Sequence, residues 1–259
     1  MLLAGKTVVV SGVGSGLGRE VAQVALRDGA NVVLGSRREE HLAAIADDLD
    51  PSGERVAWQR TDITDPEQCD ALAALGVDRF GGVDGLAQVA AFDPPFGGVM
   101  DQETVDWNAA FGAIVLGSVQ MVKAVAPRMT ERGGGSVVLI GAQAMYRPQV
   151  PQIAYAAAKG ALNSSMYYMA TDLGPSRIRV NTVVPTWMWG PPVEGYVNWQ
   201  AQERGVPAEE IIGGITANMP LGEIPADEDV AESAIFLCSD RARMITGQTL
   251  YVNSGEYMT

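Results

Sequence analysis

Short runs of β-branched and other apolar residues alternate along the chain with longer segments whose apolar positions recur every three to four residues. The first run covers 7–12 and is almost entirely apolar, as expected of a strand that helices cover on both faces. In the segment 16–29 that follows, Leu17, Val21 and Val24 share one face of a helix. The pattern predicts a series of strand–helix units.

This alternation continues to the end of the chain. A helix is expected to begin at Pro66, because Asp65 is a favourable N-cap and proline suits the first helical position. Further strands are predicted at 31–36, 55–62, 83–90, 136–142, 178–184 and 249–253. Further helices are predicted at 39–49, 103–130, 152–173 and 227–238. The order is typical of an α/β fold with a Rossmann-type doubly wound parallel sheet, about seven strands with helices on both faces. With 259 residues and no flexible linker, we expect one domain over 1–259.

The segment 186–220 interrupts this rhythm with a Gly-Pro-Pro sequence and several aromatic residues. We predict an irregular connection there. Connections of this length in a compact domain are usually functional, so we interpret it as a substrate lid. Trp187, Trp189 and Tyr196 are expected to form a wall for a flat, apolar substrate. The alternative is that these rings pack against a neighbouring subunit.

Charge and composition exclude several classes of protein. The chain has 31 acidic and 18 basic residues, a net charge of −13, which argues against a nucleic-acid partner and against binding to anionic membranes. It has no apolar run long enough to span a bilayer and no secretory signal pattern, so we expect a soluble cytoplasmic protein. Two distant cysteines and one histidine leave no disulfide framework, no metal site and no Ser–His–Asp triad.

A glycine-rich loop, SGVGSGLG at 11–18, connects the first predicted strand to the first predicted helix. Gly12, Gly14, Gly16 and Gly18 allow a tight turn and a close approach of the backbone to a pyrophosphate at the helix N-terminus. The spacing differs from GxGxxG, and a glycine-rich turn without a ligand is the alternative. The preceding strand and the following helix favour a dinucleotide site.

The end of the second strand bears on the choice of dinucleotide. An acidic residue here would hold the ribose hydroxyls of NAD, but this chain has Ser36 followed by Arg37 and a second arginine. Guanidinium groups suit a 2′-phosphate, so NADP(H) is favoured, with NAD(H) as the alternative. Asp62, at the end of the third strand, is positioned to accept a hydrogen bond from the adenine amino group, with the backbone of Ile63 beside it.

Tyr155 and Lys159 are four residues apart and therefore share one face of the predicted helix 152–173. A nearby ammonium group favours the phenolate and lowers the pKa of a tyrosine, which prepares the phenol for proton transfer. Lys159 can also hold the nicotinamide ribose. Alone, such a pair is usually an ordinary surface pair, but its place after a nucleotide loop favours catalysis.

Taken together, the motifs resemble the short-chain dehydrogenase/reductase family, of the short soluble type. The resemblance covers nearly the whole chain: the glycine loop, Asp62, the Tyr155–Lys159 pair, the strand ending at Pro185, and the closing sequence GQTLYVNSG at 247–255. It implies that Tyr155 and Lys159 are the catalytic residues. It also implies a homodimer or homotetramer formed through the helices 103–130 and 152–173. The further cofactor contacts that it implies are Ser15, Leu17, Ala90, Pro185 and Met188.

The chain departs from this family at two catalytic positions. The family uses Asn, Ser, Tyr and Lys, but here the Ser position holds Ala142 and the Asn position holds Ile114. Gln143 is the nearest replacement donor toward the substrate, unless its side chain points away from the site.

Two hypotheses about activity therefore stay open. The first is an oxidoreductase that interconverts a ketone and a secondary alcohol with NADP(H), on a mainly apolar small molecule that is cyclic or acyclic. The alternative is a nucleotide-binding family member without dehydrogenase turnover, acting as a sensor or partner protein.

Overall fold

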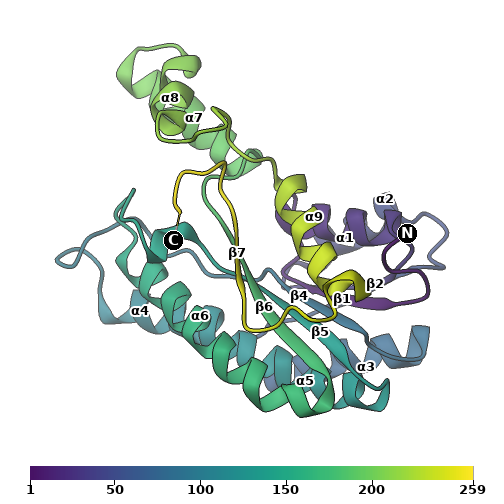
Figure 1. Cartoon of the computed structure of the whole chain (residues 1–259). Coiled ribbons are helices and arrows are strands. Elements are labelled where there is room, and N and C mark those ends of the chain that lie inside the picture. Colours follow the sequence, from purple (N-terminus) through teal and green to yellow (C-terminus); the bar gives the residue numbers. More distant parts are fainter. Residues whose placement is uncertain (259) are drawn as a thin grey trace.

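Seven parallel strands form one sheet in the computed structural model, which describes residues 1–258 and leaves only position 259 of the expected domain outside (Figure 1). The strands are β1 Thr7–Ser11, β2 Asn31–Ser36, β3 Val56–Arg60, β4 Gly85–Gln88, β5 Gly135–Ile140, β6 Ile178–Pro185 and β7 Thr249–Val252. Their spatial order, β3-β2-β1-β4-β5-β6-β7, reverses direction between β1 and β4. Ligands of such sheets bind at this reversal, outside the carboxyl ends of the strands. The predicted Rossmann-type fold is confirmed.

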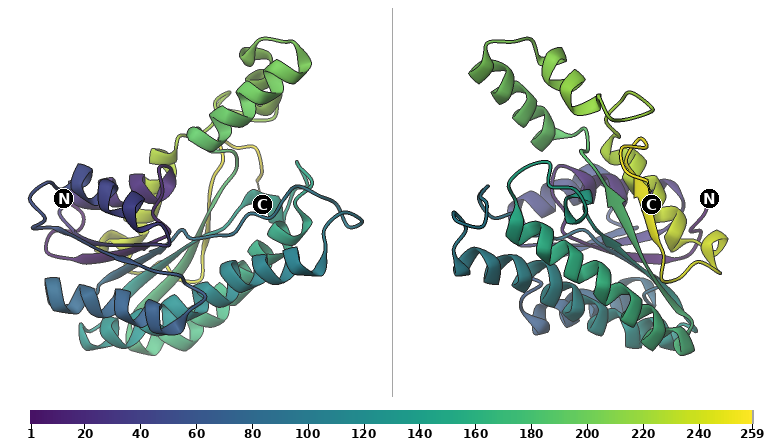
Figure 2. Two further views of the ribbon diagram at one scale, coloured as in Figure 1. Left: turned by 180° about the vertical axis from the view of Figure 1, so that it is seen from behind. Right: turned by 60° about the vertical axis from the view of Figure 1, so that its left-hand side comes forward.

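Helices cover both faces of the sheet (Figure 2). One face carries α1 Leu17–Arg27, α2 Glu39–Leu49 and α9 Asp227–Cys238; the other carries α3 Pro66–Phe80, α4 Thr104–Phe111, α5 Ser118–Glu131 and α6 Ile153–Leu173. Strand β1 is apolar because helices cover both of its faces. Val8 and Val10 pack in the core under α1 and α9, while Val9 packs in the core on the opposite face.

Local sequence signals account for the start of α3. The Asp65 carboxylate accepts hydrogen bonds from the backbone N–H groups of Glu67 and Gln68, and Pro66 takes the first helical position. The helix ends at Gly81, whose φ of 79° is a left-handed conformation that glycine adopts without strain. The predicted beginning of this helix is confirmed.

The predicted helix 103–130 is interrupted in its middle. A π-helical stretch, η1 Gly112–Gly117, joins α4 to α5 and contains Ile114. The hydroxyl of Ser118 donates to the Ile114 carbonyl at 2.6 Å. Single turns of π-helix occur often at functional sites. By length and composition alone the continuous run Thr104–Glu131 matches a membrane span, but half of its apolar window is buried inside the protein, as in a core helix.

The expectation of an irregular lid is wrong, because most of 186–220 is helical. α7 Pro191–Arg204 and α8 Ala208–Thr216 form a helical hairpin that stands away from the sheet in every view (Figures 1 and 2). The proline pair that suggested a stiff loop occupies the first turn of α7, where a missing N–H costs no hydrogen bond. Three short 3₁₀ turns complete the described chain: η2 Gln143–Met145, η3 Gly174–Ser176 and η4 Asp240–Ala242.

Candidate active site

The glycine loop is pressed against the chain that follows β4. Gly12 has a φ of 98°, and a Cβ there would lie 2.2 Å from the Ala90 nitrogen. A Cβ on Gly18 would lie 2.3 Å from the Gly12 carbonyl oxygen, so the packing of α1 requires this glycine. Gly14 has nothing within 4 Å of the equivalent point, which leaves the loop open to a ligand. Gly16 is the N-cap of α1 and makes no side-chain cap, so the first N–H groups of α1 are available to an anion.

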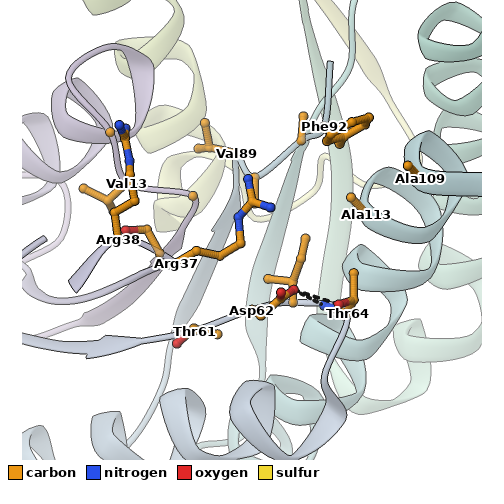
Figure 3. Close-up of a pocket in the computed structure, with 16 residues that line it drawn as sticks. Val13, Arg37, Arg38, Thr61, Asp62, Thr64, Val89, Phe92, Ala109 and Ala113 are labelled. Atoms are coloured by element: carbon orange, nitrogen blue, oxygen red, sulfur yellow. Dashed lines mark hydrogen bonds between the residues drawn. The ribbon is translucent and has the colours of Figure 1, made fainter. Parts of the chain in front are cut away.

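A cavity of about 860 Å³ opens beside this loop (Figure 3). It brings together many of the predicted cofactor residues: Gly12, Gly14, Ser36, Arg37, Asp62, Ile63 and Ala90. The sequence reasoning missed other residues that line it, among them Val13, Thr61, Thr64, Phe92 and Ala113. These come from the ends of β1, β3 and β4 and from the helix opposite, and no short motif marks them.

Two arginines and a hydroxyl occupy the β2 end of the cavity. Arg37 reaches across the cavity toward Val89, and Arg38 runs beside Val13 (Figure 3). The Ser36 hydroxyl is buried and has no hydrogen-bond partner within the described residues. A buried hydroxyl is normally hydrogen-bonded, so this one suits a ligand with strong acceptors. Two exposed guanidinium groups next to it suit a phosphate.

The Asp62 carboxylate is held in a fixed, ionised state. It accepts hydrogen bonds from the Thr64 N–H at 3.0 Å and the Thr64 hydroxyl at 2.8 Å. These two bonds hold the pKa of Asp62 below its ordinary value, and the positive charges of Arg37 and Arg60 lower it further. An acceptor in this position is compatible with the predicted contact to an adenine amino group.

Tyr155 and Lys159 lie on α6, close to the carboxyl end of β5. Lys159 is buried, and its Nζ atom donates to the carbonyl oxygen of Ile140, the last residue of β5, at 2.6 Å. The same Nζ atom lies 5.6 Å from the centroid of the Tyr155 ring. The pair therefore stands at the edge of the sheet that also carries the glycine loop.

The electrostatics of this pair differ from the sequence-based expectation. Burial lowers the pKa of Lys159 to about 8, although the negative charge of Asp93 opposes the shift. Burial also raises the pKa of Tyr155, and Asp93 raises it further. Desolvation and the charge of Asp93 thus set the direction of the shift, which is opposite to the lowering that the sequence predicts for Tyr155. Tyr155 is a protonated phenol at neutral pH.

Asp93 is a charged residue of the site that the sequence reasoning missed. It lies in the loop after β4, just beyond the cavity residue Phe92, and its charge acts on both Tyr155 and Lys159. Desolvation raises the pKa of Asp93, and Lys159 opposes that shift. Its position follows from tertiary contacts, so no motif identifies it.

The loop that carries Asp93 is fastened to the chain just before Tyr155. The Gly97 N–H donates to the Pro151 carbonyl at 2.7 Å. The Ala154 N–H donates to the Gln102 side chain at 2.9 Å. These two bonds fix the loop beside the start of α6.

Ala142 and Ile114, which stand at the family's Ser and Asn positions, offer no polar group to the site. Ala142 is the extended residue before the turn η2, and Ile114 is fully buried. Gln143 does not replace the missing donor, which corrects our expectation. Its Oε1 atom accepts from Asn253 at 2.8 Å and its Nε2 atom donates to Glu256 at 2.7 Å, so the amide is turned to the C-terminal segment.

Three aromatic residues of the lid form a cluster of mutually tilted rings. The rings of Trp187 and Tyr196 have centroids 5.2 Å apart, and Trp199 adds a third ring 6.1 Å from Tyr196. Trp189 is 37% exposed, and its backbone N–H donates to the Pro225 carbonyl at 2.7 Å. Two of the three predicted wall residues are thus in contact with each other.

The remaining predicted cofactor residues lie around the ends of β1 and β6. Ser15 is exposed on the glycine loop, and Leu17 is buried in α1. Pro185 is the last residue of β6 and is buried, and Met188 packs partly against the core under α1 and α9. All four lie at the carboxyl edge of the sheet.

Comparison with known proteins gives one consistent result. A family model described as Enoyl-(Acyl carrier protein) reductase matches residues 12–256. Human dehydrogenase/reductase SDR family member 4 is 32% identical over 253 residues, which cover 98% of this chain and 88% of the relative. The 7alpha-hydroxysteroid dehydrogenase of Escherichia coli K12 is 29% identical over 253 residues, covering 98% and 94% of the two chains.

Solved structures agree with the sequence relatives. The crystal structure of a variant of actinorhodin polyketide ketoreductase with NADPH has a TM-score of 0.87 to this chain, with 27% identity and 97% of each chain covered. The sheet order, the glycine loop, the Tyr155–Lys159 pair and these likenesses all agree. The chain belongs to the short-chain dehydrogenase/reductase family of NAD(P)-dependent oxidoreductases.

Proposed function

We propose that this protein is an NADP(H)-preferring oxidoreductase that interconverts a ketone and a secondary alcohol on a mainly apolar substrate, cyclic or acyclic. The observation that carries the proposal is the placement of Tyr155 and Lys159 at the sheet edge beside a cavity that presents Ser36, Arg37 and Arg38. A polyketide ketoreductase with NADPH and a hydroxysteroid dehydrogenase among the similar proteins support it.

The cofactor would supply or accept the hydride at the substrate's carbinol carbon. Ser36 and Arg37 would bind the 2′-phosphate, and Asp62 with the Ile63 backbone would bind the adenine. Lys159 would hold the nicotinamide ribose. The glycine loop and the beginning of α1 would bind the diphosphate, with the remaining contacts from Ser15, Leu17, Ala90, Pro185 and Met188.

Tyr155 would move the proton at the substrate oxygen. A phenol whose pKa is raised is fully protonated at neutral pH, so it is ready to donate to the alkoxide that forms during ketone reduction. Lys159, with a pKa of about 8, is mostly cationic at pH 7 and would stabilise the phenolate that remains. The electrostatics of the site therefore favour reduction as the facile direction near neutral pH.

An apolar substrate is supported by the residues around the reacting group. Ala142 and Ile114 replace polar groups with hydrocarbon, and Trp187 and Tyr196 place aromatic surface on the lid. The side chains of Ala142 and Ile114 cannot donate a hydrogen bond to a substrate carbonyl.

The same two residues favour a second candidate function. A family member that lacks two of four polar catalytic groups could bind NADP(H) without turnover, as a sensor or partner protein. Losing one donor to a developing oxyanion costs on the order of 10²–10³ in rate, so the loss of two is a substantial handicap.

We further propose a soluble cytoplasmic homodimer or homotetramer. Val105 and Leu116 on the α4–η1 run are 65% and 61% exposed, and Tyr167 and Tyr168 on α6 are 50% and 73% exposed. Exposed large apolar side chains on two long helices suit a subunit interface. The net charge of −13 argues against nucleic-acid and membrane partners.

The test is a reductase assay of the purified protein with NADPH and a panel of alicyclic and aromatic ketones, read at the nicotinamide absorbance band. Turnover that disappears in Tyr155→Phe and persists in Tyr168→Phe, an exposed tyrosine of the same helix, supports the oxidoreductase. NADPH binding without turnover on any ketone of the panel favours the second candidate.

A further inference from the structure

Asp227 is a buried carboxyl group without a partner. It is the first residue of α9 and is only 8% exposed, its side chain forms no hydrogen bond or ion pair within residues 1–258, and its carboxylate oxygens keep only a small contact with solvent. Buried carboxylates in proteins are normally paired or hydrogen-bonded, because leaving water costs the charged form several kcal/mol. The isolation of this side chain therefore calls for a functional explanation.

The carboxyl group lies where the glycine loop meets the base of the lid. A Cβ on Gly190 would lie 2.3 Å from its Oδ2 atom, and a Cβ on Gly16 would lie 3.1 Å from the same atom. Gly16 is the N-cap of α1 and Gly190 the N-cap of α7. Glycine at both positions leaves the space that this carboxyl group occupies beside the anion-binding end of α1.

Within the described residues, no positive side chain lies close enough to pair with Asp227. On α1, Glu20 faces it and is paired with Arg19 at 3.0 Å. On its own helix, Glu228 is paired with Arg27 at 3.5 Å, while Asp229 accepts from the Ala226 N–H at 2.8 Å.

The glycine loop and the lid base contribute only uncharged residues at this point, Gly14 to Gly16 and Trp189 to Gly190. Burial and the charge of Glu20 raise the pKa of Asp227 to about 6, so the isolated protein carries a carboxylate there at neutral pH.

We propose that Asp227 binds the diphosphate of the dinucleotide as a neutral carboxylic acid, taking up one proton from solvent when the nucleotide binds and donating it in a hydrogen bond to a phosphate oxygen. The inference rests on the proposed function only in requiring a dinucleotide at the glycine loop. A diphosphate at the N-terminus of α1 brings negative charge next to an ionised carboxylate in a poorly solvated place. Protonation removes this repulsion and turns an acceptor into a donor. No bond other than O–H is made or broken.

The proposal predicts a proton-linked affinity. Above pH 6 the carboxylate must take up a proton before the nucleotide binds, and this reduces the binding free energy. The Kd therefore rises by up to about tenfold for each pH unit. Below pH 5 the group is already protonated, and this dependence disappears. Isothermal titration calorimetry in buffers of different ionisation enthalpy should show close to one proton taken up at pH 7.5.

The probes are chosen to separate the diphosphate from the 2′-phosphate, which itself titrates near pH 6. ADP-ribose carries the diphosphate alone, and adenosine 2′-monophosphate lacks it. We expect proton uptake at Asp227 with ADP-ribose and NADPH, and none with adenosine 2′-monophosphate. Because this experiment measures binding, it stands even if every ketone of the panel fails to react.

Asp227→Asn imitates the neutral acid and keeps its shape. At pH 8 we expect it to bind ADP-ribose at least tenfold more tightly than the parent, with the difference vanishing at pH 5. Asp227→Ala removes the donor and should bind about fivefold more weakly than Asp227→Asn. Glu228→Gln, an exposed acid one position along, is the matched control and should behave as the parent.

Two results would overturn the proposal. One is binding of ADP-ribose without proton uptake and without a change in Asp227→Asn. The other is weaker NADPH binding in Asp227→Asn with unchanged ADP-ribose binding, which would mean that an ionised Asp227 accepts from the nicotinamide carboxamide instead. Thermal melts of each variant without nucleotide separate either result from misfolding.

Discussion

The Nε2 atom of Gln143 donates a hydrogen bond to the Oε2 atom of Glu256, and the two atoms lie 2.7 Å apart. Glu256 is buried, and its carboxylate also accepts from the side chains of Gln149 and Thr186, with Arg147 3.7 Å away. The end of the chain is thereby fastened to the segment that leads into α6 and to the residue that follows β6. The C-terminal segment thus forms a wall against the chain between β5 and α6.

Removing this carboxylate should loosen that wall. Glu256→Ala leaves one buried donor and two partly buried donors without their acceptor, and we expect the free energy of unfolding to fall by about 3 kcal/mol, measured by chemical denaturation. Glu256→Gln keeps one acceptor and should lose less. Glu223→Ala, at an exposed acid before α9, is the control and should change the stability by less than about 0.5 kcal/mol. Equal losses in Glu256→Ala and Glu223→Ala would contradict this account.

Restoring a hydroxyl next to Tyr155 should raise the rate of any ketone reduction that the parent catalyses. On the proposed function, Ala142→Ser provides a hydrogen-bond donor beside the substrate carbonyl oxygen, and the expected increase in kcat is about 10- to 10³-fold. Because the amide of Gln143 is bound to Asn253 and Glu256, Gln143→Ala should lower stability and leave kcat of the folded protein nearly unchanged. No gain from serine together with a large loss of kcat in Gln143→Ala would reverse these assignments.

The strand–helix order outside 186–220 was predictable because most of its elements carry their own local signals. β2 and α2 begin and end where their apolar patterns predict, and the Asp65-Pro66 pair marks the beginning of α3. The glycine loop and the four-residue Tyr155–Lys159 spacing are equally local. Such features depend on neighbours in the sequence, which is why one sequence suffices to find them.

The features that sequence reasoning missed depend on contacts between distant segments. Asp93 acts on Lys159 only because the loop after β4 is bound to the segment before α6. Gln143 turns away from the site because Glu256, over a hundred residues later, accepts its hydrogen bond. The lid was expected to be irregular because its prolines were interpreted as breaks in structure, although proline at the first turn begins a helix.

The preference for NADP(H) should depend on Arg37. Arg37→Ala removes a guanidinium group from the β2 end of the cavity, and we expect NADPH to bind about 10- to 100-fold more weakly, with NADH affected less than twofold. Ser36→Asp should shift the preference toward NADH, because a carboxylate repels the 2′-phosphate and accepts from ribose hydroxyls. Binding titrations with both reduced cofactors measure this, with the exposed Arg204→Ala as control. Equal affinities of the parent protein for the two cofactors would refute it.

The pH profile of ketone reduction should report Lys159. Its ammonium group is present below a pKa of about 8, so kcat/KM should be constant at lower pH and fall up to tenfold per unit above it. Asp93→Asn removes a charge that raises the pKa of Lys159, so the falling limb should move to lower pH. Asp172 is an exposed acid on α6, the helix that carries Lys159, and Asp172→Asn should leave the falling limb at the same pH. A limb that does not respond to Asp93→Asn would mean that another group titrates there.

The isolated carboxyl group of Asp227 should also be visible in the stability of the protein without nucleotide. Its pKa is raised from an ordinary value of 3.8 to about 6, so the folded state holds the proton more tightly than the unfolded state. The free energy of unfolding is therefore highest below about pH 4 and declines as the pH rises toward 6, by at most about 3 kcal/mol in total.

Asp227→Asn cannot ionise and should be more stable than the parent at pH 7.5 by up to that amount, and equal to it at pH 4. Glu228→Gln should follow the parent at both pH values. If Asp227→Asn and the parent unfold with the same free energy at pH 7.5, the carboxylate is solvated in the folded protein, and the basis for proton-linked nucleotide binding is lost with it.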